Sequence, residues 1–358
     1  MPSDNRVIVA SAGSGKTTAI VDDACGDTAR QAALITYTNN GRDEITAKAY
    51  QRFGCVPPHA TISTWYAFLL RHFVRPYQNS LYDVRVTGIQ FVNGRSARYA
   101  LASDIRHHYF SKPDLMFVDK VSKFACQVTE QTGGLPPQRF AQIFDRLLID
   151  ESQDLAGYDL ELIEILLKSG VEITLVGDHR QATFSTNSAA KNKQFGGPNI
   201  VLKFEEWEKA GLCKIDYHNY SHRCVQAICD LADQFHPKSP NTESKNTDVT
   251  GHDGVFAVRR SQVPAYMQAY NPQPLRYSRA TRNIPGKPIN YGNAKGMTFD
   301  RTLIYPHAPL KKFLMTGDLK DAGKEIAKIY VAITRARQSV AFVVDDNTPA
   351  PGLTNYEP

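Results

Sequence analysis

The chain has 358 residues, enough for two domains of ordinary size, each with its own hydrophobic core. Hydrophobic residues make up 42% and charged residues 22% of the sequence, as in soluble globular proteins, and no apolar run is long enough to cross a bilayer. The net charge of +6 permits a polyanionic partner without requiring one. Since the N-terminus lacks a signal peptide and the six cysteines lack CxxC or zinc-ligand spacing, we expect a cytoplasmic protein that does not bind membranes.

A phosphate-binding loop is predicted near the N-terminus. Residues 6–10 ("RVIVA") have the pattern of a short buried strand, and a glycine-rich turn and a helical pattern follow directly. Glycines let backbone N–H groups converge on phosphate oxygens, while Lys16 would reach the β- and γ-phosphates and Thr17 would ligate Mg²⁺. The alternative is a glycine turn with a surface lysine, which the flanking strand and helix disfavour. The predicted nucleotide-binding residues of this segment are Ala10, Ser11, Ala12, Gly13, Ser14, Gly15, Lys16, Thr17 and Thr18.

A second apolar run ends at Ile149, and three acidic residues follow it within "RLLIDESQD" (residues 146–154). One explanation is an ordinary strand that ends in solvent. The other is that the acids hold a cation, since a buried carboxylate is costly unless something neutralises its charge. In a protein with a phosphate loop, Asp150 would hold Mg²⁺ and Glu151 would polarise the attacking water. Gln153 and Asp154 are not needed for metal binding, so they indicate a more particular function.

Eight segments, in order along the chain, resemble the motifs of the UvrD/Rep/PcrA-like superfamily 1A DNA helicases. They are "ASAGSGKTT", "LITYTNNGRDEI", "STWYAFLLR", "DESQD", "TLVGDHRQATF", "HNYSHRC", "GNAKGMTFDRTLIY" and "YVAITRAR". The resemblance covers essentially the whole chain. It implies an α/β fold with two RecA-like P-loop motor domains, each a parallel sheet flanked by helices. It also implies that ATP and Mg²⁺ bind between these domains and that single-stranded DNA binds across them.

The resemblance assigns further roles around the nucleotide. Gln181 would sense the γ-phosphate and couple it to DNA, while Arg223 and Arg335 of the second domain would act as arginine fingers. His222 stands where the family has a tyrosine and can still stack on a base, and Gly296 is the remaining expected nucleotide contact. The glutamine motif that reads adenine in the family has no counterpart before the phosphate loop. A preference for ATP is therefore implied by the family alone.

The residues that bind DNA are expected on loops at the carboxyl ends of strands, where parallel α/β sheets bind their ligands. Aromatic side chains at such positions can stack on bases, at about 1–3 kcal/mol each, without reading the sequence. For each aromatic residue taken singly, the alternative is packing in the core. The aromatic candidates are Trp65, Tyr66 and Phe184. The polar candidates are Thr38, Asn39, Thr64, Lys295 and Thr298.

The resemblance also predicts the domain organisation. The first motor domain would span residues 1–195, of which about 75–140 can form only a reduced helical accessory insertion. The second would span residues 196–358. Within it, residues 236–254 are polar and turn-rich, which predicts a flexible loop in place of the family's large second insertion. The segments after this loop have the pattern of a strand, a helix and a strand of the core sheet.

The leading functional hypothesis is an ATP-driven translocase or helicase on single-stranded DNA, with 3′→5′ polarity and a role in DNA repair. RNA stays open as the nucleic acid along which the protein moves. The alternative is a regulatory or effector ATPase subunit that senses DNA and controls a protein partner such as a nuclease, in recombination or anti-phage defence. A general P-loop kinase or GTPase is a third class, which "DESQD" together with "VAITRAR" argues against.

Overall fold

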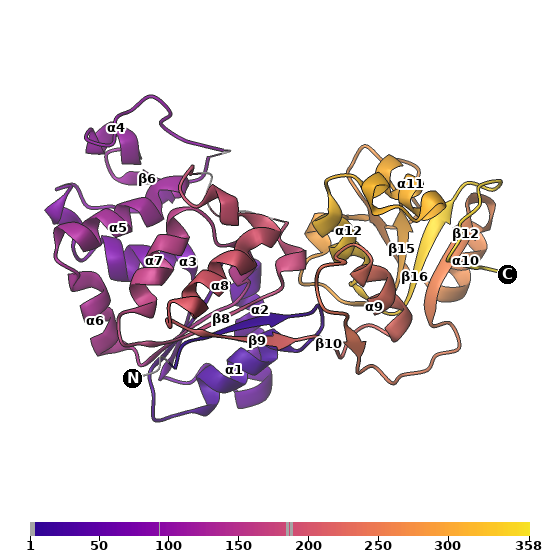
Figure 1. The fold of residues 1–358 in the computed structure, drawn as a ribbon, viewed down its shortest axis with the longest axis horizontal. Helices are drawn as coiled ribbons and strands as arrows, with labels where there is room; N and C mark the ends of the chain where they lie inside the picture. The colour runs from indigo at the N-terminus through magenta and orange to yellow at the C-terminus, as the bar shows by residue number, and fades with distance from the viewer. Residues whose placement is uncertain (1–3, 93, 184–185, 187–188) are drawn as a thin grey trace. The chain divides into compact units, whose positions relative to one another are not determined.

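The computed structural model describes residues 4–92, 94–183, 186 and 189–358. Its contacts divide the chain into two compact units, which Figure 1 draws as a ribbon. The first unit comprises Met1–Val9 and Lys16–Tyr217, and the second comprises Ala10–Gly15 and His218–Pro358. The glycine-rich turn of the phosphate loop is thus grouped with the second unit, although the residues before and after it belong to the first.

The first unit is built on a six-stranded sheet with the strand order β3-β2-β7-β8-β1-β9. Four neighbouring pairs, β3·β2, β2·β7, β7·β8 and β8·β1, are parallel. The central strands are continuous apolar runs, as expected for parallel strands that are buried on both faces. In chain order the strands are β1 (Arg6–Ala10), β2 (Ala32–Thr36), β3 (Ala60–Thr64), β7 (Arg146–Ile149), β8 (Glu172–Gly177) and β9 (Lys214–His218).

Helices cover both faces of this sheet, as Figure 1 shows. Because side chains alternate along a strand, Leu34 and Leu148 belong to one core cluster while Ile35 and Ile149 belong to the other. The first cluster packs on α1 and α2, and the second packs on α3 and α5 to α8. In chain order the helices are α1 (Lys16–Gly26), α2 (Asn39–Phe53), α3 (Trp65–Leu69), α4 (Ile105–Tyr109), α5 (Val121–Gln131), α6 (Leu135–Ile143), α7 (Tyr158–Leu167) and α8 (Ile200–Lys209).

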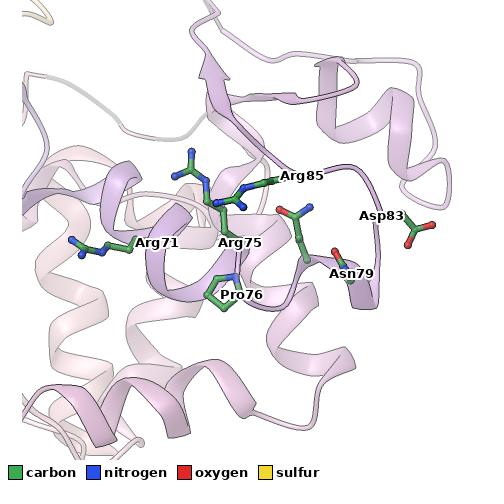
Figure 2. A pocket seen from close by; sticks show the side chains of 7 residues that line it. Arg71, Arg75, Pro76, Asn79, Asp83 and Arg85 are labelled. Carbon is green, nitrogen blue, oxygen red and sulfur yellow. The ribbon is translucent and has the colours of Figure 1, made fainter.

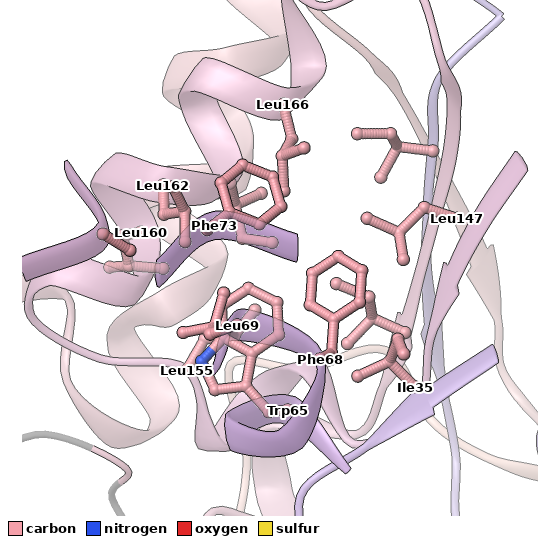
Figure 3. Packing of buried hydrophobic residues seen from close by; sticks show 14 of the residues in the cluster. Ile35, Trp65, Phe68, Leu69, Phe73, Leu147, Leu155, Leu160, Leu162 and Leu166 are labelled. Carbon is pink, nitrogen blue, oxygen red and sulfur yellow. The ribbon is translucent and has the colours of Figure 1, made fainter. Parts of the chain in front are cut away.

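The larger cluster is rich in aromatic side chains. Figure 3 shows side chains of α3 and α7 meeting those of β2 and β7 in this core. Trp65 stacks on Phe68 with ring centroids 5.7 Å apart, and Phe68 meets Phe140 edge-on at 5.3 Å. These contacts hold α3 against the sheet directly after β3, so they fix the carboxyl end of that strand.

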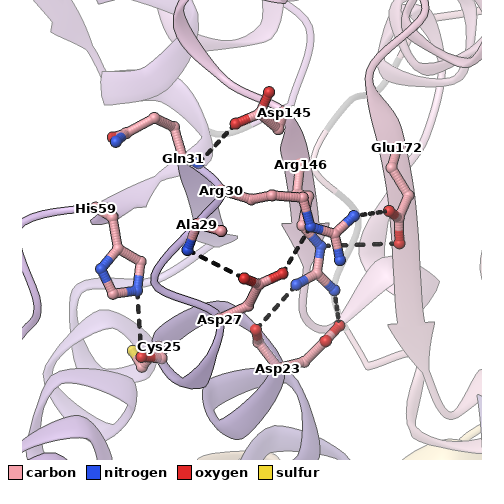
Figure 4. Close-up of polar contacts among 10 residues, drawn as sticks. All are labelled: Asp23, Cys25, Asp27, Ala29, Arg30, Gln31, His59, Asp145, Arg146 and Glu172. Carbon is pink, nitrogen blue, oxygen red and sulfur yellow. Dashed lines mark hydrogen bonds and ion pairs between the residues drawn. The ribbon is translucent and has the colours of Figure 1, made fainter.

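Charged side chains stabilise the opposite end of the sheet (Figure 4). Arg146 begins β7 and is only 3% exposed. Its guanidinium donates to the carbonyl oxygen of Asp23 at 2.9 Å, pairs with the Asp23 carboxylate, and lies 3.8 Å from a carboxylate oxygen of Glu172. Because β7 starts at Arg146 and ends just before Asp150, this network anchors the strand that delivers Asp150.

The predicted insertion at residues 75–140 contains strands as well as helices. Its small sheet has the order β4-β6-β5, in which β4 and β6 are parallel and β5 and β6 antiparallel. Phe124 of α5 and Phe140 of α6 belong to the main core cluster, so these two helices are part of the main fold of the first unit. The strands are β4 (Gly88–Gln90), β5 (Phe110–Lys112) and β6 (Leu115–Phe117).

The second unit contains another six-stranded sheet, with the order β14-β13-β15-β16-β12-β17 and parallel pairing throughout. One face packs on α9, α11 and α12, and the other on α10. The strands are β12 (Gly254–Arg259), β13 (Gln273–Arg276), β14 (Ile289–Asn290), β15 (Phe299–Tyr305), β16 (Ala336–Val344) and β17 (Thr354–Asn355). The helices are α9 (Gln226–Asp233), α10 (Val263–Tyr270), α11 (Ala308–Thr316) and α12 (Ile326–Ile333).

Residues 236–254 form a loop that carries the two-residue strand β11 (Glu243–Ser244), which pairs with β10 (Tyr220–Ser221). The Asn246 side chain donates to the carbonyl oxygen of Arg223 at 2.7 Å. After the loop come β12, α10 and β13, which confirms the predicted strand, helix and strand.

Both units therefore confirm the predicted α/β class with parallel sheets flanked by helices. The predicted domain boundary lay at 195/196, whereas the contacts group the chain up to Tyr217 with the first unit. The reason is that α8 packs in the first core and β9 extends the first sheet. Within the described residues, no helix combines the length and the apolar character needed to cross a membrane.

Candidate functional site

The phosphate loop joins β1 to α1, and Gly13 and Gly15 adopt positive φ angles of 78° and 82°. Other residues are strained in this region, so the loop favours glycine at both positions. At Gly13 an added Cβ would also lie 2.5 Å from the Cβ of Arg223, which is a collision. The Oγ of Ser14 is buried and has no hydrogen-bond partner among the described residues. A phosphate oxygen would satisfy this hydroxyl group, so the loop fits a bound phosphate.

The two residues predicted to hold Mg²⁺ lie within hydrogen-bond distance of each other. Thr17, in the first turn of α1, donates its hydroxyl hydrogen to Oδ2 of Asp150 at 2.8 Å. Burial and the adjacent Glu151 raise the pKa of Asp150 to about 6, although Lys16 and the Thr17 hydroxyl act in the opposite direction. A divalent cation would favour the charged carboxylate.

These oxygens suit Mg²⁺, which usually takes one or two protein ligands and completes its shell with phosphate oxygens and water. No group of three or more His, Cys, Asp or Glu side chains in the described part of the chain is arranged to hold a metal ion alone.

Glu151 follows the end of β7 in an unusual backbone conformation. Its φ of 58° and ψ of 38° lie in the left-handed region, which residues other than glycine, asparagine and aspartate seldom adopt. Its N–H donates to Oδ1 of Asp150 at 2.9 Å, and its carboxylate accepts a hydrogen bond from Nε2 of Gln153. Gln153 therefore positions the carboxylate that we predict to be the general base. Such local strain is common at functional sites.

Gln153 continues this path towards β8. Its Oε1 accepts a hydrogen bond from the backbone N–H of Asp178 at 3.0 Å. Asp178 in turn accepts from Nε2 of Gln181 at 2.9 Å and from Nε of Arg180 at 3.0 Å. Burial alone would raise the pKa of Asp178, but the charges of Arg180 and Lys16 outweigh it and hold that pKa well below its usual range. The carboxylate at the centre of the path therefore stays charged.

Gly177, the last residue of β8, makes this arrangement possible. An added Cβ there would lie 2.4 Å from Oε1 of Gln153 and 2.6 Å from Oγ of Ser152. Sequence reasoning selected Gln181 and overlooked Gly177 and Asp178. Both stand in "TLVGDHRQATF" where a buried strand ends, which is the signal that could have found them.

The predicted arginine fingers meet at Thr334 in the second unit. Nη1 of Arg223 donates to the Thr334 carbonyl oxygen, and Nη2 of Arg335 donates to the Thr334 hydroxyl, both at 3.1 Å. Arg335 is only 1% exposed, and its Nε donates to the carbonyl oxygen of Val331. The N–H of His222 donates to the carbonyl oxygen of Gly13 at 2.9 Å, which places the residue before Arg223 against the phosphate loop. The finger roles stay predictions.

The polar candidates for DNA contact in the first unit gather at the carboxyl ends of β2 and β3. These strands pair in parallel with Thr36 opposite Thr64. Thr38 and Asn39 are exposed, and the Thr38 hydroxyl caps α2 by accepting from the N–H of Gly41 at 3.0 Å. The sheet therefore brings Thr38, Asn39 and Thr64 to one edge, which we call the strand-end face.

The aromatic candidates differ from one another. Trp65 is fully buried, and its Nε1 donates to Oδ1 of Asp159 at 2.9 Å, so the prediction that its ring stacks on a base is wrong for this structure and core packing describes it. Tyr66 is half-buried, and its hydroxyl donates to the carbonyl oxygen of Thr186 at 2.8 Å. Phe184 lies outside the described residues.

The remaining candidates lie on the surface of their units. In the second unit, Lys295 is half-buried, whereas Gly296 and Thr298 are exposed in the turn between the 3₁₀ segment Tyr291–Ala294 and β15. In the first unit, Thr18 is half-buried and lines a surface hollow with Lys48 and Arg52. The structure places these residues without testing their roles.

A family model described as an AAA domain matches residues 1–187, more than half of the chain. Comparison with curated proteins finds no match. Among solved structures, the Arterivirus nonstructural protein 10 helicase has 14% identity and a TM-score of 0.46, over 96% of this chain and 60% of that chain. Its complex with DNA has 14% identity and a TM-score of 0.48, over 96% of this chain and 61% of that one. The PRRSV helicase has 18% identity and a TM-score of 0.47, over 97% of this chain and 55% of that chain. The chain thus spans less than two thirds of the length of these structures.

Proposed function

The chain belongs to the AAA domain family, and we propose that it is an ATP-hydrolysing motor of the UvrD/Rep/PcrA-like helicase type that moves along single-stranded DNA in the 3′→5′ direction. One observation carries this proposal. A continuous hydrogen-bond path runs from Glu151 through Gln153 and Asp178 to Gln181. It joins the proposed general base to the proposed γ-phosphate sensor. A motor needs such a connection, because hydrolysis must change the conformation that holds its track.

The chemistry of the first unit supports phosphoryl transfer to water. Lys16 would neutralise charge on the β- and γ-phosphates, and Thr17 and Asp150 would hold Mg²⁺. Bound with the nucleotide, the ion would supply further charge neutralisation at the phosphates. Glu151 would orient the attacking water and polarise its O–H bond. Arg223 and Arg335 would add positive charge where the transition state develops negative charge.

The strand-end face supports a nucleic-acid track. Thr38, Asn39 and Thr64 offer hydroxyl and amide groups at one edge of the sheet, where backbone phosphates can accept hydrogen bonds. In the second unit, Lys295 and Thr298 are the proposed backbone contacts. Contacts to backbone phosphates carry no sequence information, so the proposed binding is independent of sequence.

Displacement of streptavidin from biotinylated oligonucleotides tests the proposed movement. With ATP, the protein should displace streptavidin from the 5′ end of a single strand faster than from the 3′ end, because a 3′→5′ motor runs towards the 5′ end. RNA of the same sequence tests the choice of track. Displacement that needs no ATP, or that favours the 3′ end, would contradict the proposed activity or its polarity.

A further inference from the structure

A concave surface of the first unit, outside the nucleotide site, is lined by arginines. Figure 2 shows Arg71, which lies in the π-helical turn Leu70–Val74 after α3, and Arg75, which directly follows that turn. It also shows Arg85, from the next loop. The hollow has a volume of about 560 Å³. We call it the arginine pocket. Its other lining residues are Pro76, Gln78, Asn79 and Asp83.

Hydrogen bonds hold the pocket in shape. Arg75 donates from Nε to the carbonyl oxygen of Val86 at 2.8 Å and from Nη2 to that of Thr87 at 2.7 Å. Gln78 is buried, and it donates to the carbonyl oxygen of Val84 at 2.7 Å and accepts from the N–H of Val86 at 3.0 Å. These bonds fix the loop that carries Arg85. The backbone of this loop would therefore lose little conformational entropy when a ligand binds there.

The positive charge of the pocket is largely uncompensated. Arg71 and Arg85 are exposed, and neither forms a hydrogen bond or an ion pair with any residue that the structure describes. Asp83 supplies the one carboxylate among the lining residues, and Figure 2 shows it apart from the arginine side chains. Below the surface, burial and then the charges of Arg139 and Arg71 lower the pKa of His72 to about 4. His72 is therefore neutral near pH 7 and adds no charge beneath the pocket.

The pocket lies close to the strand-end face along the chain. Thr64 ends β3, and α3 and the π-helical turn follow it without a break. Arg71 comes seven residues after Thr64, which corresponds to about 10 Å along a helix. A nucleic-acid strand bound at Thr38 and Thr64 can reach that distance within a few nucleotides.

We propose that the arginine pocket binds backbone phosphates of the nucleic-acid track beyond the strand-end face, an inference that rests on the proposed function. Guanidinium groups bind phosphate oxygens through paired N–H donors. The described lining residues include no aromatic side chain, so they offer a base no stacking surface. The pocket therefore favours a phosphodiester backbone over a free nucleotide, and it adds affinity without sequence preference.

The test compares two double variants by fluorescence anisotropy with a labelled single-stranded oligonucleotide, without ATP. Arg71→Gln/Arg85→Gln removes the two arginines that have no other partner, while Arg75 stays to hold the loop. Arg95→Gln/Arg98→Gln removes the same charge from exposed positions in the same insertion that do not line the pocket. Thermal unfolding of each variant checks that the fold is intact.

The pocket variant should bind roughly tenfold more weakly, and the slope of log K against log [salt] should become shallower by about 1.4, or ~0.7 per phosphate contact. The control variant should bind as the wild type does. Equal affinities and equal salt slopes for all three proteins would overturn the proposed phosphate binding at the pocket, while leaving the proposed motor function intact. Inorganic phosphate that binds the wild type but not the pocket variant, with unchanged oligonucleotide affinity, would show a free-anion site and also overturn it. A wild-type protein that binds no oligonucleotide would overturn both proposals.

Discussion

Oε1 of Gln153 accepts a hydrogen bond from the backbone N–H of Asp178 at 3.0 Å, although 25 positions separate the two residues in the chain. Gln153 belongs to the loop after β7 and Asp178 to the loop after β8, two neighbouring parallel strands. The bond links the loop that carries Glu151 to the loop that carries Gln181. A change at one residue can therefore be transmitted to the other through a direct contact.

Gly177→Ala should break this contact. The added Cβ would collide with Oε1 of Gln153 and Oγ of Ser152, so we expect a loss of about 1–3 kcal/mol in the free energy of unfolding. ATPase activity should fall as well, because Gln153 positions Glu151. Urea unfolding and steady-state turnover measure the two effects. Gly292→Ala is the control, since an added Cβ there meets nothing within 4 Å. Equal unfolding midpoints for the two variants would contradict the packing argument.

Asp150→Asn should stabilise the protein at pH 8 when nucleotide and divalent ions are absent. The folded-state pKa of Asp150 is raised to about 6, so the folded protein holds this proton more tightly than the unfolded chain does. Stability is therefore lost as the pH rises from about 4 to about 6, by up to about 3 kcal/mol. Urea unfolding should show a gain for the variant at pH 8 and little difference at pH 4. A gain of the same size at both pH values, or at pH 8 in the exposed control Asp300→Asn, would count against this explanation.

Trp65→Phe should reduce stability without changing affinity for single strands. The change removes the hydrogen bond to Asp159 and leaves a cavity in the core, at a cost of about 2–3 kcal/mol. Tyr66→Leu, at the half-buried neighbour that stays a stacking candidate, should weaken binding instead. Oligonucleotide titrations of both variants distinguish the roles. Weaker binding by Trp65→Phe with unchanged stability would return Trp65 to the DNA-binding face.

How much the sequence predicted depended on how local each signal was. The strand at residues 6–10, the helix over "TTAIVDDAC" after the glycine turn and the position of Asp150 after an apolar strand follow from short patterns, and the structure confirms all three. An apolar run, a glycine turn and a helical period are readable without knowledge of the rest of the chain.

The wrong prediction for Trp65 and the missed partner of Gln153 both depend on contacts between distant segments of the chain. The burial of Trp65 depends on Asp159, which lies 94 positions away and accepts its hydrogen bond. A single aromatic residue after a strand does not reveal which face of the next helix it will occupy. The partnership of Gln153 with Asp178 likewise depends on β7 and β8 being neighbours in the sheet, and a sequence alone does not state the strand order.

Arg223→Ala should slow ATP hydrolysis far more than it weakens ATP binding. A finger arginine acts on charge that develops in the transition state, so its loss lowers kcat by roughly a thousandfold or more. Steady-state kinetics and equilibrium nucleotide binding measure the two quantities separately. Arg337→Ala removes a half-exposed arginine that lies 3.5 Å from Asp248 and serves as the matched control. If Arg223→Ala lowered both quantities equally, Arg223 would have a structural role beside Thr334.

The most direct test of the motor proposal is the ATPase rate with and without single-stranded DNA, for the wild type and for Glu151→Gln. We expect DNA to stimulate the wild type strongly. The variant should still bind ATP yet show no turnover under either condition, because a glutamine cannot polarise the attacking water. A wild-type protein that binds ATP but ignores DNA would contradict the motor proposal and favour the partner-controlled ATPase. Normal turnover by Glu151→Gln would remove Glu151 as the general base.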